Sequence, residues 1–189
     1  QIQDLAKIVL RPEEYLAAIL SRKPRFIGIT AMTAFIAAAA SLAAGATLDH
    51  IKNGLEKLRP TAGRLELIPG FNGARVLDDT YNANPASLAA GMEVLKDAGG
   101  ERVLVIGDMA ELGDGGPEIH RRMGELARSM GIDRLYAIGE LARLTAQGFG
   151  AGAVHADRHD SLVNELRNVM HGNMTILVKG SRVMRMEQV

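Results

Sequence analysis

ARVLDDTYNANPASLAAGMEVLKDA, residues 74–98, sets a pattern that the rest of the chain repeats. Residues 74–79 form an apolar run that ends in two aspartates, which is typical of a strand entering a polar loop. Residues 80–84 are mostly polar, and Pro85 suits the first turn of a helix. The stretch therefore predicts a strand, a polar loop and a helix extending to residue 98.

The same order of strand and helix recurs to the end of the chain. Strands are expected at 102–108, 134–139, 153–156 and 174–180, with helices at 117–131, 140–149 and 158–171 between them. Apolar strands that alternate with amphipathic helices indicate right-handed βαβ units on a parallel sheet covered on both faces. We therefore predict an α/β fold, a Rossmann-like, mostly parallel sheet flanked by helices.

The first third of the chain has a different pattern. Helices are expected at 12–22, from residue 30 to Gly45, and after a Thr47 N-cap, with strands at 25–30 and 64–68. Prolines and glycines interrupt these patterns between residues 59 and 73. We predict two domains, a partial α/β segment at 1–68 and the Rossmann-like domain at 69–189.

Composition excludes several classes of protein. The 22 basic and 22 acidic residues cancel, and aromatic residues make up only 4%, so nucleic acid is not an expected partner. The chain has no cysteine, its first residues do not resemble a signal peptide, and the alanine-rich run at 31–47 is too short to span a membrane. We expect a cytoplasmic protein without membrane insertion.

Residues 78–84, DDTYNAN, hold more polar groups than a turn needs. Asn84 is predicted to be the N-cap of the helix that begins at Pro85. Capping does not explain Asp78, Asp79, Tyr81 and Asn82. A carboxylate at a strand end can accept ribose hydroxyls, and amides suit the edge of a purine, so nucleotide binding remains an alternative to a capped, solvated loop.

Two further polar clusters follow predicted strands. The loop at 107–116, GDMAELGDGG, fits a solvated acidic loop with glycines for turning; the alternative is that Asp108 and Glu111 act in a hinge or hold an ordered loop. His120 lies within the next helix and is expected to be structural. Residues 179–182, KGSR, suit a carboxylate or phosphate, or else a solvated basic turn.

Arg64 lies near the predicted domain boundary. Such an arginine is usually a surface ion-pair partner, although it can also reach a ligand.

In combination, DDTYNANPAS, VIGDMAELGDGG and ILVKGSRVMRME resemble the C-terminal domain of the Mur ligases over residues 31–189. The resemblance implies an ATP-dependent, Mg²⁺-assisted ligase of cell-wall synthesis that acts as a monomer. The forms of YNANP and GDMAELG favour the branch that joins D-alanyl-D-alanine to a UDP-linked muramoyl tripeptide through an acyl phosphate. Residues 1–68 then correspond to part of the central ATPase domain.

The resemblance also assigns roles to individual residues. It implies that Asp79 contacts the adenosine ribose, that Asn82 and Asn84 lie beside the nucleotide, and that Arg64 faces ATP. The segment Lys179, Gly180, Ser181 and Arg182 is implied to line the pocket of the incoming dipeptide. No catalytic or metal-ligating residue is assigned within the 189 residues.

The sequence departs from the family before residue 31. There is no phosphate loop of the form G-x-x-x-x-G-K-[ST], and the family's magnesium-binding glutamate and histidine and its carbamate lysine have no counterpart. Thr33 stands where the family has an asparagine. A chain consisting of these residues alone is expected not to turn over ATP. The alternatives are a different amino-acid ligase of the superfamily and a non-catalytic nucleotide-binding or interaction module.

Overall fold

The computed structural model describes residues 31–57 and 62–189. The chain divides into two compact units, residues 1–61 and residues 62–189, which are described separately below. The predicted helix at 12–22 and the predicted strand at 25–30 lie outside the described residues.

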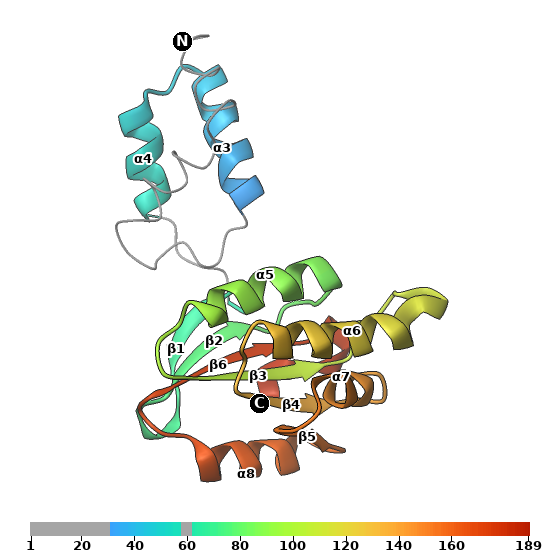
Figure 1. Cartoon of the computed structure of the whole chain (residues 1–189). Coiled ribbons are helices and arrows are strands. Elements are labelled where there is room, and N and C mark those ends of the chain that lie inside the picture. The colour runs from blue at the N-terminus through green and yellow to red at the C-terminus, as the bar shows by residue number, and fades with distance from the viewer. Residues whose placement is uncertain (1–30, 58–61) are drawn as a thin grey trace. The chain divides into compact units, whose positions relative to one another are not determined.

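The described part of the first unit consists of two helices, α3 (Ala31–Ala43) and α4 (Leu48–Lys57) (Figure 1). The chain leaves α3 through Gly45, whose φ of +91° lies in the left-handed region that favours glycine. The Thr47 hydroxyl accepts a hydrogen bond of 3.2 Å from the backbone N–H of His50 at the start of α4. The predicted ends of both helices, at Gly45 and Thr47, are therefore confirmed.

The second unit contains a six-stranded sheet with the order β1-β2-β6-β3-β4-β5. All neighbouring strands are parallel except β1 and β2, which are antiparallel. This arrangement confirms the predicted mostly parallel α/β fold. The strands are β1 (Glu66–Pro69), β2 (Arg75–Asp79), β3 (Glu101–Gly107), β4 (Arg134–Ile138), β5 (Ala153–Ala156) and β6 (Met174–Lys179).

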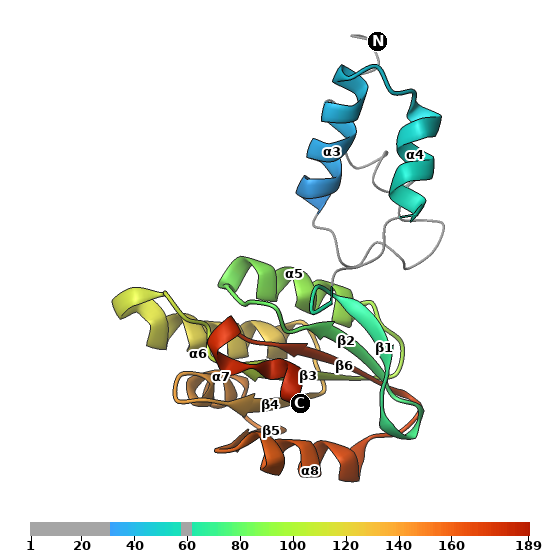
Figure 2. The same ribbon diagram turned by 180° about the vertical axis from the view of Figure 1, so that it is seen from behind.

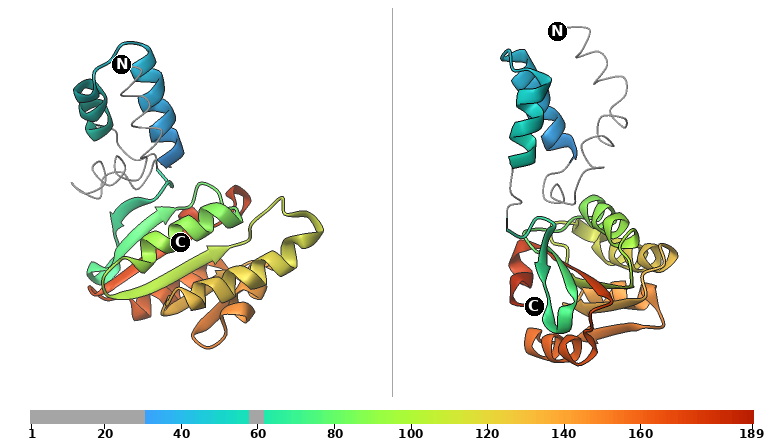
Figure 3. Two further views of the ribbon diagram at one scale, coloured as in Figure 1. Left: turned by 45° about the horizontal axis from the view of Figure 1, so that its top comes forward. Right: turned by 90° about the vertical axis from the view of Figure 1, so that its left-hand side faces the viewer.

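Helices cover both faces of the sheet (Figures 2 and 3). One face carries α5 (Pro85–Lys96), α6 (Gly116–Ser129) and α7 (Ala142–Phe149); the other carries α8 (His159–Val169) and short turns at Arg182–Met184 and Met186–Gln188. Val103 and Val105 of β3 belong to a core cluster that includes Leu162 of α8 and Met186. The alternate residues of β3, Leu104 and Ile106, are fully buried as well. Burial on both faces explains why the strands read as continuous apolar runs.

Strand β1 differs from its prediction. An alternating strand was expected at 64–68, whereas β1 covers Glu66–Pro69 at the sheet edge, with Leu67 and Ile68 both exposed. Because Glu66 pairs with Asp78 of β2, the compact unit begins at Ala62, earlier than the predicted domain start at residue 69. An edge strand has a neighbour on only one side, so its burial pattern is weaker.

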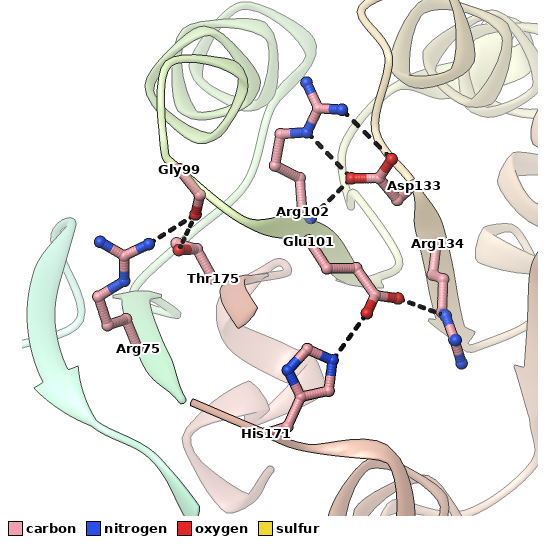
Figure 4. A network of polar contacts seen from close by, with 8 residues as sticks. All are labelled: Arg75, Gly99, Glu101, Arg102, Asp133, Arg134, His171 and Thr175. Atoms are coloured by element: carbon pink, nitrogen blue, oxygen red, sulfur yellow. Dashed lines mark hydrogen bonds and ion pairs between the residues drawn. The ribbon is translucent and has the colours of Figure 1, made fainter. Parts of the chain in front are cut away.

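Polar side chains form a network at the amino ends of the parallel strands (Figure 4). Glu101, which begins β3, pairs with Arg134 of β4 at 2.6 Å and with His171 at 2.9 Å. The neighbouring Arg102 binds Asp133 through its side chain and its backbone N–H. These contacts join β3, β4 and the turn before β6 at the amino ends of the strands. The polar loops singled out in the sequence follow the opposite, carboxyl ends.

Candidate functional site

The loops that the sequence singled out meet at the carboxyl edge of the sheet. Asp79, which ends β2, is the register partner of Lys179, which ends β6, and Lys179 in turn is level with Ile106 of β3. Gly107 at the end of β3 is level with Ile138 of β4. The polar loops that begin after these four strands therefore share one edge, the usual ligand-binding edge of an open α/β sheet.

A buried ion pair lies at the centre of this edge. The Lys179 ammonium is 2.5 Å from Oδ2 of Asp79, and the two side chains are only 2% and 13% exposed. Lys179 Nζ also donates a hydrogen bond of 2.8 Å to the backbone carbonyl of Asn82. Burial raises the pKa of the Asp79 carboxyl, while the Lys179 charge and hydrogen bonds from Lys179 and the Leu65 amide partly offset the rise.

The loop between β2 and α5 is ordered by its own side chains. Asp78 Oδ1 accepts from the backbone N–H and the hydroxyl of Thr80, at 3.1 and 2.7 Å. Asn84 and Ser87 form a reciprocal capping box at the start of α5, which confirms the predicted N-cap. Asn82 uses its side-chain oxygen to accept from the Ala83 N–H at 2.9 Å. The NH₂ groups of Asn82 and Asn84, both exposed residues, remain as donors at this edge.

Arg64 packs against this loop. Its guanidinium carbon lies 4.2 Å from the centre of the Tyr81 ring, a distance typical of a cation–π contact. The backbone N–H of Tyr81 donates to the carbonyl of Gly63 at 2.9 Å, which fixes the chain beside it. Sequence reasoning noted Tyr81 in the polar cluster and assigned it no role. The contact joins positions that are distant in sequence, and the only local signal was an aromatic residue among polar ones.

The residues after Lys179 differ in their accessibility. Gly180 is buried against the backbone of Gly107, and the Ser181 N–H donates to the carbonyl of Asp108 at 2.9 Å. Ser181 is 2% exposed, and its hydroxyl has no hydrogen-bond partner among the described residues. The side chain of Arg182 is 65% exposed and 3.5 Å from Glu187. Arg182 is thus the cation of this segment that faces solvent.

The loop after β3 is held by two anchors. Asp108 Oδ1 accepts from the Ala142 N–H at the start of α7, at 2.6 Å. Fully buried His120 accepts from the Met109 N–H through Nε2 at 3.0 Å, and its Nδ1 lies 2.8 Å from the Gly116 carbonyl. This pairing requires a neutral imidazole with its proton on Nδ1. His120 and Asp108 therefore order the loop, whereas Glu111 is exposed with a φ of +64°.

The described residues contain no cluster of three or more His, Cys, Asp or Glu side chains arranged to hold a metal ion. Among residues 31–57 and 62–189, no helix is long and apolar enough to cross a membrane. The chemistry available at the carboxyl edge comes from amide donors, an aromatic ring under a guanidinium, a buried ion pair and an exposed arginine.

Comparison with known proteins points to one family. Residues 63–182 match the family described as "Mur ligase, glutamate ligase domain". The UDP-N-acetylmuramoyl-tripeptide–D-alanyl-D-alanine ligase of Escherichia coli K12 is 43% identical over 158 residues, which make up 82% of this chain and 35% of that enzyme. The ligase of the same name from Bacillus subtilis is 33% identical over 166 residues, 84% of this chain and 36% of that enzyme.

Solved structures agree with the sequence relatives. MurF from Acinetobacter baumannii superposes with a TM-score of 0.75 at 33% identity, over 83% of this chain and 36% of that one. MurF from Thermotoga maritima, solved in complex with ADP, gives a TM-score of 0.73 at 25% identity, over 84% of this chain and 36% of that one. The chain spans about a third of the length of the curated relatives it matches.

Proposed function

Because the chain belongs to the Mur ligase family, we propose that it serves the ATP-dependent ligation of D-alanyl-D-alanine to a UDP-linked muramoyl tripeptide in peptidoglycan synthesis. One observation carries the proposal. The carboxyl edge brings Arg64, the loop after Asp79 and the segment at Lys179–Arg182 together in a chain similar to ligases of that name. ADP in the Thermotoga maritima relative supports an adenine nucleotide as one ligand.

The proposed reaction has two steps. A carboxylate oxygen of the tripeptide attacks the γ-phosphorus of ATP, and ADP leaves. The amine of the dipeptide then attacks the acyl carbon, phosphate leaves with the C–O bonding electrons, and the amine loses a proton. The first step replaces a poor oxide leaving group with phosphate, and exclusion of water protects the acyl phosphate from hydrolysis.

Individual side chains fit the nucleotide half of this reaction. The free NH₂ groups of Asn82 and Asn84 suit the ring nitrogens of adenine, which only accept hydrogen bonds. Asp79 has lone pairs beyond those that Lys179 occupies, so it can accept a ribose hydroxyl. The Arg64 guanidinium, held over Tyr81, supplies positive charge for the phosphates. The family implies Mg²⁺ as well, but the described residues provide no carboxylate cluster to hold it.

The acceptor half is proposed for the end of β6. Exposed Arg182 suits the carboxylate of the incoming dipeptide, because a guanidinium can bind a carboxylate through two parallel hydrogen bonds. We propose that the ligase acts as a monomer in the cytoplasm.

A second candidate is a nucleotide-binding module without catalysis. The amide donors of Asn82 and Asn84 and the Arg64 guanidinium suit a nucleotide whether or not a reaction follows. The two candidates differ in whether the carboxyl edge supports ligation once a phosphate loop is supplied.

A chimaeric enzyme tests the proposal. Residues 31–189 replace the matching part of the Escherichia coli ligase, which contributes the rest of its chain. We expect ATP-dependent formation of the muramoyl pentapeptide with D-alanyl-D-alanine and not with free amino acids, measured by mass spectrometry of the product. The unaltered Escherichia coli ligase is the control. A folded chimaera that binds ADP without ligating the dipeptide would favour the non-catalytic module, and one that prefers a free amino acid would indicate another branch.

A further inference from the structure

Lys179 was predicted to line the acceptor pocket, but its ammonium is engaged elsewhere. Its side chain is 2% exposed, and Nζ binds the Asp79 carboxylate and the Asn82 carbonyl. Both partners lie at the end of β2 or in the loop that follows it. A cation with two internal acceptors and almost no exposed surface is poorly placed to receive the carboxylate of a dipeptide.

The sheet itself sets the position of this contact. Asp79 and Lys179 are register partners on adjacent parallel strands, so both side chains lie on the face covered by α5. Gly91 of α5 lies above them, where a Cβ atom would come within 3.0 Å of Leu177 and 3.8 Å of Asp79 Oδ2. The absence of a side chain at Gly91 lets the helix approach the pair closely.

The pair connects three separate segments of the chain. The pair joins the end of β2, at Asp79, to the end of β6, at Lys179, and the N–H of Tyr81 in the loop after Asp79 donates to the Gly63 carbonyl. Lys179 reaches across to the Asn82 carbonyl in the middle of the loop. A hydrogen bond from a charged donor to a backbone carbonyl is a strong constraint on a loop that otherwise relies on short local contacts.

We propose that Lys179 is a positioning residue, which holds the loop at residues 80–84 in the shape that receives an adenine nucleotide. The acceptor contact then falls to Arg182, whose side chain is exposed. This inference rests on the proposed function for the identity of the ligand. It assigns Lys179 to the nucleotide half of the site although its sequence motif belongs to the acceptor half.

The first experiment needs no ligand. Amide hydrogen exchange is compared in the 189-residue protein and in its Lys179→Met variant, with Lys96→Met, which alters an exposed lysine of α5, as the matched control. We expect exchange at Tyr81 and Ala83 to rise by about tenfold or more in Lys179→Met, while the amides of β3 stay within about twofold. A uniform rise across the sheet, or no change in the loop, would overturn the proposal.

A double variant, Asp79→Asn with Lys179→Met, keeps the test decisive if Lys179→Met alone does not fold. Lys179→Met leaves the Asp79 carboxylate buried without its partner, which is strongly destabilising, whereas Asp79→Asn with Lys179→Met removes both charges. The Asn82 carbonyl still loses its donor in the double variant. We therefore expect a folded protein whose loop amides exchange faster than those of the wild type, and protected loop amides in this variant would contradict the proposed role.

The second experiment asks which ligand depends on Lys179. ADP and D-alanyl-D-alanine are titrated separately by calorimetry into the wild type, Asp79→Asn, the double variant and Arg182→Met. Because Asp79 is itself a proposed ribose contact, the double variant is compared with Asp79→Asn, and we expect it to bind ADP about tenfold or more weakly than that variant, while Arg182→Met binds ADP as the wild type does. Loss of dipeptide binding alone in the double variant would overturn the proposal. If the wild type binds no ADP, the proposed function fails for this chain, and the exchange comparison still decides whether Lys179 orders the loop.

Discussion

The ion pairs at the two edges of the sheet differ in their burial and in their effect on the protein. At the carboxyl edge, Asp79 and Lys179 are buried together, and each would be costly to leave without the other. At the amino edge, Arg102 and Asp133 are partly exposed, at 27% and 40%, so solvent screens their attraction. The first pair shapes the proposed site, whereas the second contributes a modest increment to stability.

The amino-edge pair leads to a prediction about pH. Hydrogen bonds from the Arg102 side chain, together with its backbone N–H and positive charge, hold the pKa of the Asp133 carboxyl below its usual value of 3.8. A lowered pKa in the folded state means that the stabilisation is present above pH 3.8 and is lost as the pH falls through the lower value. We expect Asp133→Asn to reduce the free energy of unfolding near neutral pH by about 0.2–1 kcal/mol.

The measurement is urea unfolding at several pH values. The difference between the wild type and Asp133→Asn should shrink as the pH falls below about 4. Asp114→Asn, which changes an exposed carboxylate of the loop after β3, is the matched control and should follow the wild type. A constant difference across the whole pH range would contradict this account of Asp133.

His120 illustrates a residue whose surroundings decide its role. A histidine in a sequence is compatible with catalysis, metal binding or structure. Here both ring nitrogens are occupied by backbone groups, the Met109 N–H and the Gly116 carbonyl, and the ring has no exposed surface. The side chain therefore fixes the loop after β3 and has no free nitrogen for a ligand.

Among the elements, helices α6 and α7 depend on glycine for their close approach. A Cβ atom at Gly124 of α6 would clash with the backbone carbonyl of Thr145 and lie 2.7 Å from the backbone nitrogen of Phe149, both in α7. A Cβ atom at Gly148 of α7 would likewise clash with the backbone carbonyl of Arg121 in α6. Backbone atoms of packed helices cannot move aside as flexible side chains do, so the spacing of the two helices requires these glycines.

We expect Gly124→Ala to lower the free energy of unfolding by about 1–3 kcal/mol, because an overpacked interface must separate. Urea unfolding followed by circular dichroism measures the change. Gly115→Ala, at the turn that leads into α6, is the matched control, since its Cβ would meet Ile119 at an ordinary 3.6 Å. Equal stability of the two variants would show that α6 and α7 can separate without cost.

At the scale of the whole molecule, groups that bind substrates must be distinguished from groups that transfer the phosphoryl group of ATP. The carboxyl edge offers groups that suit a nucleotide and an acceptor, whereas the 189 residues contain no phosphate loop. We expect a sample whose intact mass is 20.2 kDa to release no phosphate from ATP above background. The chimaera that supplies a phosphate loop is the matched control, and ATP-dependent ligation by the 20.2 kDa sample would refute this prediction.

Much of the fold could be predicted because its signals are local. Apolar runs in 74–79 and 102–108 predict strands, and Pro85 and Asn84 predict where α5 begins. These signals depend on residues a few positions apart, so they survive without knowledge of the rest of the molecule. The edge strand β1 was less well predicted, since its residues are mostly exposed and carry a weak alternation.

The sequence was sufficient for the order of elements, the mostly parallel sheet and the polar character of its carboxyl edge. Only the tertiary structure identified the partners of Lys179. The same holds for the contact of Arg64 with the Tyr81 ring and for the hydrogen bonds of His120. Asp79 meets Lys179 because β6 inserts between β2 and β3 in a particular register. Local patterns specify strands but not which strand lies beside which, so contacts between residues far apart in sequence emerge only when the sheet assembles.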